Sequence, residues 1–314
     1  MTTADLVDVL VLGELNPDLI LTGEDVAPRF GQVETLVDDA HLVLGSSGAI
    51  FASGAAKLGL RTVMSGLVGD DPFGEFVVRQ LEEHGVSTEG VVVDPGVATG
   101  LTVVLNRGAD RAILTHLGAM AQMAASRVDP ALVARARHIH ITSYFLQRSL
   151  QKELPKLLWQ AKQNGTTTSL DTNWDPAQRW DDGVHDVLPL IDTFLPNAAE
   201  AMALTGTRST QAAAGALSGT VPNVVVKRGA EGAYAVCDGE VFEVRPPRVT
   251  VRDTTGAGDS FDAGYVFGLL SDLPMAERLR IACLCGARST EGMGGVAAQI
   301  TGSELRSALS ETPS

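Results

Sequence analysis

The sequence contains few cysteines and no long apolar run. Three cysteines are too few for a disulfide framework, and Cys283 and Cys285 share a short apolar segment with no further ligands at zinc spacing. We therefore expect buried, reduced thiols and a reducing compartment. No stretch of 18 apolar residues is present, and residues 1–5 lack the basic and apolar segments that begin a secretion signal. These absences predict a cytoplasmic protein that spans no membrane.

Basic residues are also scarce. The chain has 24 Lys and Arg against 38 Asp and Glu, which gives a net charge of −14. Such a surface repels nucleic acids and anionic membranes, so we expect neither as a partner. An anionic substrate would need a site that supplies its own positive potential. In other respects the 314 residues, 45% apolar and 20% charged, are typical of a soluble globular protein with a sizeable core.

Apolar segments and amphipathic segments alternate along most of the chain. This alternation predicts an α/β fold, a mainly parallel sheet with helices on both faces. Ligands bind such sheets beyond the carboxyl ends of the strands, so we expect the site in the loops that follow strands. The predicted strands are 7–13, 62–68, 138–141, 167–170, 193–195, 224–226 and 233–237, and the predicted helices are 49–58, 72–83, 149–163, 197–204, 209–218, 257–270 and 275–288.

Two stretches do not fit this alternation. Residues 14–44 mix short apolar pieces with turn residues, and 91–93 and 100–116 look like additional strands. We expect these strands to form a separate small sheet.

The most specific motif is the string Asp-Thr-Thr-Gly-Ala-Gly-Asp-Ser-Phe-Asp-Ala-Gly at 253–264. Apolar residues continue after it at helical spacing, so Gly256, Ala257 and Gly258 are expected at a helix N-terminus. Unpaired N–H groups and the positive end of the helix dipole make such a position an anion site. No Gly-Lys-Ser/Thr follows, so the string is not a P-loop.

Asp259 is expected one turn inside this helix, beside the anion site. A carboxylate there is costly unless it has a chemical role. The natural role is to take a proton from a hydroxyl that attacks a phosphoryl group. The alternative is a helix cap at Asp253 followed by a simple glycine turn.

The string resembles the signature of the ribokinase-like (PfkB) family of carbohydrate kinases. Further blocks follow in the family's order, so the resemblance spans nearly the whole chain. These blocks are Gly-Glu-Leu-Asn-Pro-Asp at 13–18, Gly-Ser-Ser-Gly-Ala at 45–49, Gly-Leu-Val-Gly-Asp-Asp-Pro-Phe-Gly at 66–74, Asp-Thr-Asn-Trp-Asp at 171–175, Pro-Asn-Ala-Ala-Glu at 196–200 and Lys-Arg-Gly-Ala-Glu-Gly at 227–232.

The resemblance implies one ribokinase-like domain over residues 1–314, with lid strands inserted at about 15–43 and 91–117. In many members this lid also forms a dimer interface, so a homodimer through the lid is implied. The implied activity is transfer of the γ-phosphate of ATP to a hydroxymethyl group of a sugar or sugar-like molecule, with Mg²⁺. Asp259 would be the general base and Gly256 to Gly258 the anion hole.

The resemblance also places the acceptor. Asp18 follows the first strand, where a carboxylate can accept hydrogen bonds from two sugar hydroxyls, with Asn16 beside it. Gly45 and Gly48 would let the backbone approach the sugar. Tyr144 would stack on a ring or serve as a wall residue.

Two positions depart from the family's pattern. Ser46 stands where the family has a second glycine, and Ile50 stands where it has an asparagine. An apolar side chain thus replaces an amide that would bond a hydroxyl. Either the acceptor has fewer hydroxyls at that place, or Ile50 is core packing.

The nucleotide is expected on the other side of the site. The resemblance places the adenine pocket at 227–232 and near Cys283, with Lys227, Gly229, Gly232 and Gly258 against the nucleotide. Asn197 and Glu200 face one side of a helical turn and would hold Mg²⁺ through water. Their alternative role is a helix cap with an acidic first turn.

Other polar residues near these motifs have open roles. Many family members bind K⁺ beside the anion hole, and the corresponding ligands would be Asp253 and backbone carbonyls near Thr255, Ala287 and Gly292. Asp171 and Asn173 would reach the phosphates or support their loop. Asp262 is expected to be solvated or a cap partner.

Two other functions stay open. Nucleosides such as adenosine are alternative acceptors, since they also present a ribose hydroxyl. A second alternative is a catalytically silent member that binds a sugar or nucleotide without turnover.

Overall fold

The computed structural model describes residues 6–107 and 110–311. Residues 1–5, on which the absence of a signal segment was judged, and residues 108 and 109 in the second expected lid segment lie outside it. Among the described residues no helix is both long and apolar enough to cross a bilayer.

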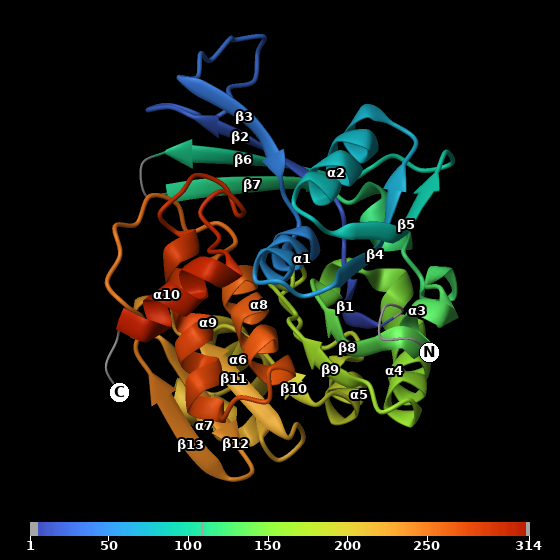
Figure 1. The fold of residues 1–314 in the computed structure, drawn as a ribbon. Coiled ribbons are helices and arrows are strands. Elements are labelled where there is room, and N and C mark those ends of the chain that lie inside the picture. The colour runs from blue at the N-terminus through green and yellow to red at the C-terminus, as the bar shows by residue number, and fades with distance from the viewer. Residues whose placement is uncertain (1–5, 108–109, 312–314) are drawn as a thin grey trace.

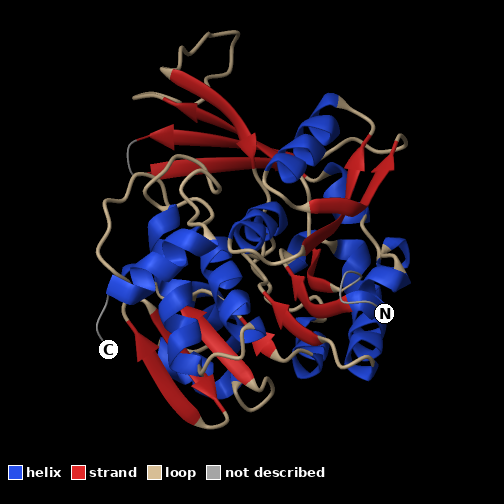
Figure 2. Cartoon of the chain, in the orientation of Figure 1, coloured by secondary structure: helices blue, strands red, loops and turns tan. Residues whose placement is uncertain are grey.

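The large sheet has nine strands, and its order confirms the predicted α/β architecture. All neighbours pair in parallel except the last two pairs, β11 with β12 and β12 with β13. Figure 2 shows helices on both sides of this sheet. Across the sheet the strands are β5 (Ser87–Asp94), β4 (Thr62–Gly69), β1 (Val7–Leu12), β8 (Ala136–Ile141), β9 (Thr167–Leu170), β10 (Thr193–Phe194), β11 (Asn223–Lys227), β12 (Ala233–Cys237) and β13 (Glu240–Val244).

Successive side chains of the central strand β1 point to opposite faces of the sheet, which explains the two helical layers. Leu10 and Leu12 point into one apolar cluster, whereas Val9 and Val11 point into another. The first cluster includes side chains of α3 (Pro130–Arg135), α4 (Arg148–Gln163), α5 (Val184–Val187), α6 (Ala198–Thr205) and α7 (Thr210–Leu217). The second includes side chains of α1 (Ser47–Lys57), α2 (Pro72–Glu83), α8 (Ala257–Leu270) and α9 (Met275–Ser289), and α10 (Gly302–Glu311) contributes to a smaller third cluster.

A second sheet has four strands, in the order β3 (Asp39–Leu44), β2 (Pro17–Thr22), β6 (Leu101–Arg107) and β7 (Asp110–His116). It lies at the top of Figure 1, where β7 is drawn lowest of the four strands. The strands that the sequence suggested within 14–44 and 100–116 are therefore in this small sheet.

The segment 91–93 is not in the small sheet, so this expectation was wrong. It belongs to β5, which pairs in parallel with β4 at the edge of the large sheet. The helix α2 connects β4 to β5 and is the crossover that a parallel pair needs. Gly90 permits the close approach, because a Cβ there would lie 2.7 Å from the carbonyl oxygen of Met64.

Asp8 anchors the amino end of β1. Its buried carboxylate accepts hydrogen bonds from the Nε of Arg61 at 2.9 Å and from Nη1 of Arg137 at 3.1 Å. The hydrogen bonds from Arg61 contribute most and, with Arg137, outweigh the effect of burial, so the pKa of Asp8 falls to about 2.

We expect Asp8→Asn to lower the free energy of unfolding at pH 7 by roughly 1 kcal/mol, because both arginines are half exposed. A carboxylate with a lowered folded pKa stabilises the protein above its unfolded pKa and loses that effect as pH falls toward the folded value. The difference between wild type and variant in urea unfolding should therefore shrink progressively from about pH 4 toward pH 2. A difference that stays constant over this range would contradict the assignment.

Candidate active site

The carboxyl ends of β1, β8, β9 and β11 meet the N-terminus of α8. Gly256 precedes α8 with a φ of 70°, and a Cβ at this position would lie 2.8 Å from the Cα of Gly295. Only glycine suits both the left-handed backbone and this close approach. The glycine string therefore forms a helix N-terminus, as expected, in which the N–H of Ala257 donates to the carbonyl of Thr254 at 3.3 Å.

Asp259 lies in the first turn of α8 and is 8% exposed. Burial is the main cause that raises its pKa, to about 8, and the negative charges of Asp171 and Glu14 add to it. The ammonium of Lys227 and a hydrogen bond from the side chain of Ser47 act in the opposite direction. A carboxyl group with this pKa can both accept and release a proton near neutral pH.

Lys227, at the end of β11, is buried between two carboxylates. Its Nζ lies 2.6 Å from Oδ2 of Asp171 and 2.9 Å from Oδ2 of Asp262. Burial alone would lower the pKa of Lys227, but these carboxylates and Glu200 outweigh it and raise the pKa. A Cβ on Gly258 would lie 3.5 Å from the same Nζ, so the ammonium is next to the anion hole.

The prediction that Asp262 is solvated was wrong. Asp262 has no exposed surface, because it faces inward from α8 and is paired with Lys227. Asp262 follows Asp259 by three residues in α8, but the lysine that pairs with it comes from β11, in a distant part of the chain.

Asp18 and Asn16 lie together beside the small sheet. The amide Nδ2 of Asn16 donates to Oδ1 of Asp18 at 3.0 Å and to Oγ1 of Thr102 on β6 at 3.2 Å. Burial, followed by the negative charge of Glu14, raises the pKa of Asp18 to about 7. Gly45 is required here, because a Cβ would lie 2.2 Å from Oδ1 of Asp18.

Glu14 is a buried residue for which no role was expected. Its carboxylate accepts hydrogen bonds from the backbone N–H of Ser47 at 2.7 Å and from Oγ1 of Thr142 at 3.0 Å. Burial raises its pKa despite these bonds and one from Ser143. Glu14 follows β1 and lies in the block 13–18 that resembles the family. This position was the signal from which a role in the site could have been predicted.

Ser46 and Gly48 shape the start of α1. The hydroxyl of Ser46 caps the helix by accepting from the N–H of Ala49 at 3.1 Å, and it donates to the carbonyl of Glu14. A Cβ on Gly48 would lie 3.1 Å from the Cα of Gly13, so glycine allows α1 to contact the end of β1.

Ile50 packs beneath the anion-hole turn. Its Cγ2 would be 2.8 Å from a Cβ on Gly256, and its Cδ1 would be 2.4 Å from a Cβ on Gly295. The side chain is 3% exposed. Of the two roles left open for this departure, the structure therefore supports core packing.

Asn197 and Glu200 form a reciprocal cap at the start of α6. Glu200 N–H donates to Oδ1 of Asn197 at 3.0 Å, and the N–H of Asn197 donates to Oε2 of Glu200 at 2.8 Å. Burial and then the charge of Asp171 raise the pKa of Glu200 to about 7. The cap does not exclude a role toward Mg²⁺, because Asn197 also lines a cavity of about 410 Å³ with Lys227.

The loop after β11 contains two glycines in left-handed conformations, Gly229 at φ 56° and Gly232 at φ 88°. A Cβ on Gly232 would lie 2.0 Å from the carbonyl oxygen of Val244. Cys283 lies on α9 against the same strand, with its Sγ 3.8 Å from that oxygen, and burial raises its pKa to about 12. The expected adenine-side residues 229, 232 and 283 are thus grouped around the end of β13.

The residues expected at a K⁺ site form a compact turn. Asp253 accepts from the N–H of Thr255 at 2.9 Å and from the N–H of Gly294 at 2.8 Å, two residues beyond Gly292. Burial opposes these bonds, but together they lower the pKa of Asp253. The carbonyl of Ala287 accepts from Oγ1 of Thr290 at 2.6 Å. In the part of the chain that the structure describes, no three His, Cys, Asp or Glu side chains are grouped to hold a metal ion.

The small sheet reaches this turn through Arg111 on β7. Its Nη1 donates to Oγ1 of Thr255 at 3.4 Å. Its charge contributes to the lowered pKa of Asp253 and opposes the rise in the pKa of Asp18. This contact was not expected from the sequence.

Tyr144 is buried, and its hydroxyl donates to the carbonyl of Asp182 at 3.0 Å. The ring packs edge-on against Phe145. Its hydrogen-bonding group is thus engaged with the backbone, as suits a wall residue.

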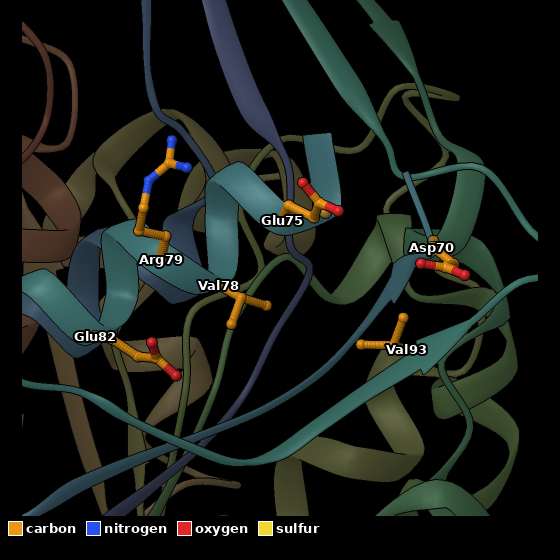
Figure 3. A pocket seen from close by; sticks show the side chains of 8 residues that line it. Asp70, Glu75, Val78, Arg79, Glu82 and Val93 are labelled. Atoms are coloured by element: carbon orange, nitrogen blue, oxygen red, sulfur yellow. The ribbon is translucent and has the colours of Figure 1, made fainter. Parts of the chain in front are cut away.

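A further cavity, of about 320 Å³, lies between α2 and the edge of the large sheet. Figure 3 shows Asp70, Glu75, Arg79 and Glu82 around it. None of the candidate site residues lines it.

Comparison with known proteins gives a consistent result. The model of the pfkB family carbohydrate kinases matches residues 7–301. A 2-dehydro-3-deoxygluconokinase of Thermoproteus tenax is 32% identical over 260 residues, which are 78% of this chain and 78% of that protein. A ribokinase of Haemophilus influenzae is 28% identical over 308 residues, which are 90% of this chain and 92% of that protein.

Solved structures share the fold. The structure of Ribokinase II from E. coli in complex with ATP and Mg²⁺ has a TM-score of 0.86 and 24% sequence identity, and it covers 98% of this chain and 100% of its own. A PfkB protein from Polaromonas has a TM-score of 0.81 and 26% identity over 96% of this chain and 99% of its own.

We expect Lys227→Met to lower the free energy of unfolding by roughly 3–5 kcal/mol, because it leaves Asp171 and Asp262 buried without their counter-charge. Adding Asp262→Asn should recover part of this loss. Urea unfolding measures both effects, and Lys162→Met on the exposed face of α4 is the matched control. Equal free energies of unfolding for the Lys227 and Lys162 variants would show that the ion pairs of Lys227 with Asp171 and Asp262 do not stabilise the fold.

Proposed function

The chain belongs to the pfkB family of carbohydrate kinases and is therefore a phosphotransferase, and from this premise we propose that it transfers the γ-phosphate of ATP to a hydroxymethyl group of a sugar or sugar-like molecule. The observation that carries the proposal is the buried carboxylate of Asp259 in the first turn of α8, beside a helix N-terminus. The two groups supply what phosphoryl transfer needs, a proton acceptor and a preorganised anion site.

In the proposed reaction, Asp259 accepts the proton of the attacking hydroxyl. The hydroxyl oxygen forms the new bond to the γ-phosphorus as the bond between that phosphorus and the ADP oxygen breaks. The N–H groups of Gly256 and Gly258 stabilise the negative charge that develops on the transferred group, whereas that of Ala257 donates to the carbonyl of Thr254. Asp259 afterwards returns its proton to solvent; its raised pKa favours acceptance of the proton over its release.

The proposed nucleotide side extends from the anion hole to the end of β13. Lys227 would act there from its buried position between Asp171 and Asp262, next to Gly258. The backbone at Gly229 and Gly232, with Cys283, would border the adenine. The relative whose structure was solved with ATP and Mg²⁺ has this fold, which supports the proposal that this chain also binds ATP and Mg²⁺.

Mg²⁺ would be held through water by the oxygens of Asn197 and Glu200, a donor set that suits it, and it would neutralise phosphate charge. Glu200 is buried with its oxygens bonded to Asn197, which favours contact through water over direct contact. A K⁺ ion would take Asp253 with carbonyls near Thr255, Ala287 and Gly292.

Acceptor binding is proposed between the end of β1 and the small sheet. Asp18 and Asn16 would bond neighbouring hydroxyls, while Gly45, Ser46 and Gly48 shape the backbone around them. The small sheet would close over the site as a lid and exclude water. Nucleosides, which present the same hydroxymethyl group, are the alternative acceptor class.

A homodimer through the lid is part of this proposal. Apolar side chains stand exposed on the small sheet, with Leu42 at 41%, Ile113 at 55% and Leu114 at 58%. Leu42 lies on β3, and Ile113 and Leu114 lie on β7, the two edge strands of the small sheet. Such exposed apolar side chains suit burial against a second copy.

We expect Asp259→Asn to reduce kcat by roughly 10²–10⁴-fold, because the amide cannot accept the proton. Turnover is measured as ADP formation coupled to acceptor phosphorylation. Asp272→Asn, at an exposed position after the end of α8, is the matched control and should retain the wild-type rate. Undiminished turnover in the Asp259 variant would reject the base assignment.

Gly45→Ala should raise KM for the acceptor by about tenfold, since the new methyl group displaces Asp18. KM for ATP should change little, because the displaced carboxylate lies on the acceptor side. Gly215→Ala in α7, where a methyl group meets no atom within 4 Å, is the control. A change in KM for ATP alone would contradict the placement of Asp18 in the acceptor site.

A further inference from the structure

Gln299 lies in the loop between α9 and α10 and joins the two helices that border the proposed site. Its Nε2 donates to the carbonyl oxygen of Ile50 in α1 at 2.8 Å and to Oγ of Ser260 in α8 at 3.0 Å. An amide nitrogen has two hydrogens, so each helix receives one of them. The side chain of Gln299 is buried, and water therefore does not compete for these two bonds.

The groups around this amide determine its direction. The carbonyl oxygen of Ile50 can only accept, so the nitrogen of Gln299 faces it and the oxygen does not. The remaining Oε1 is buried and has no hydrogen-bond partner in the part of the chain that the structure describes. A buried oxygen without a partner is unfavourable, so an apolar side chain would serve packing alone better. The two donated bonds are therefore what glutamine supplies at this position.

Gly54 leaves room for the amide between the two helices. A Cβ at this position in α1 would lie 2.9 Å from Nε2 of Gln299 and 3.1 Å from the Cβ of Ala263 in α8. Glycine is unfavourable in the interior of a helix, where alanine is preferred. The close approach of α1, α8 and the amide explains why glycine stands here.

The loop that carries Gln299 is held at two further points. The N–H of Gly294 donates to Oδ2 of Asp253 at 2.8 Å, in the turn before the anion hole. The Nζ of Lys57 in α1 donates to the carbonyl oxygen of Val296 at 2.5 Å. The loop thus presents Gln299 to α1 and α8 from a fixed position.

We propose that Gln299 is a positioning residue for the reaction: its amide fixes the distance between α1, whose start borders the acceptor, and α8, which carries Asp259. This inference rests on the proposed function, in which Asp259 is the base. Ser260 follows Asp259 directly, and the N–H of Ile50 donates to the carbonyl of Ser46 on the proposed acceptor side at 3.0 Å. Loss of the two bonds moves the base relative to the attacking hydroxyl, and a small displacement is enough to slow the transfer.

The first test is Gln299→Met, which keeps the length of the side chain and removes both donors. The measurement is the single-turnover rate of ADP formation with saturating ATP and Mg²⁺, using whichever of ribose, gluconate and adenosine reacts fastest with wild type. We expect the rate to fall about tenfold, because the base and the hydroxyl are no longer aligned, while KM for ATP stays within about twofold of wild type. An unchanged rate would overturn the inference.

Thr166→Val is the matched control for the loss of a buried hydrogen bond. The hydroxyl of Thr166 donates to the carbonyl of Ala136 at 2.9 Å, at the amino ends of β8 and β9 and away from the site. Both variants should lose stability in urea unfolding, but only Gln299→Met should lose rate per folded molecule. An equal loss of rate in the control would assign the effect to stability and reject a positioning role.

A double-mutant cycle tests the contact itself. Gly54→Ala places a methyl group where the amide lies and should lower the single-turnover rate about tenfold in the wild-type background. In Gln299→Ala the space is free, so the same methyl group should lower the rate by less than about threefold. Equal effects in the two backgrounds would show that the amide does not act through this space.

Hydrogen exchange separates this inference from the proposed function, because it needs no acceptor. Backbone amides in the first turns of α1 and α8 should exchange faster in Gln299→Met than in wild type or in Thr166→Val. Unchanged exchange together with an unchanged rate would overturn the inference while leaving the base assignment intact. Full turnover in Asp259→Asn would instead reject the proposed function, and the exchange measurement would still report on Gln299.

Discussion

The buried ammonium of Lys227 is the interaction on which the arrangement of the site depends. Carboxyl groups of Glu14, Asp18, Asp171, Glu200, Asp259 and Asp262 are all buried at this edge of the sheet. Charges of one sign at such density repel one another and resist ionisation. By pairing with Asp171 and Asp262, Lys227 joins β9, β11 and α8 at the place where Asp259 is held. Burial, followed by the negative charges of Asp171 and Glu14, raises the pKa of Asp259 into the range suited to proton transfer.

The fold and the outline of the site were predictable from local patterns. The alternation of segments gave the parallel sheet, and the glycine string gave the start of α8 with Asp259 in its first turn. The ion pairs of Lys227 were not predictable, because spacing along one helix does not show which distant side chain fills the space beside Asp262. The segment 91–93 was misplaced for a related reason: its apolar residues suit either sheet, and only the parallel crossover through α2 assigns it to β4.

The residues of the proposed acceptor side form two hydrogen-bonded groups. Asn16 links Asp18 on β2 to Thr102 on β6 within the small sheet, and Glu14 links the start of α1 to Thr142. The departure at Ile50 lies outside both groups, because its side chain packs under the anion-hole turn. The proposed acceptor site is thus lined by carboxylates, hydroxyls and a close backbone, with Arg111 as a nearby cation from the small sheet. Specificity within the family should follow from differences at these contacts.

The most direct test of the account is the formation of ADP from ATP and Mg²⁺ by the wild-type protein across a panel of sugars, sugar acids and nucleosides. The account predicts fast ADP formation with a particular acceptor, in equal amount to a product phosphorylated on its hydroxymethyl group, and slow formation without acceptor. ATP binding without phosphorylation of any panel member would contradict it and favour a protein that binds a sugar or nucleotide without turnover.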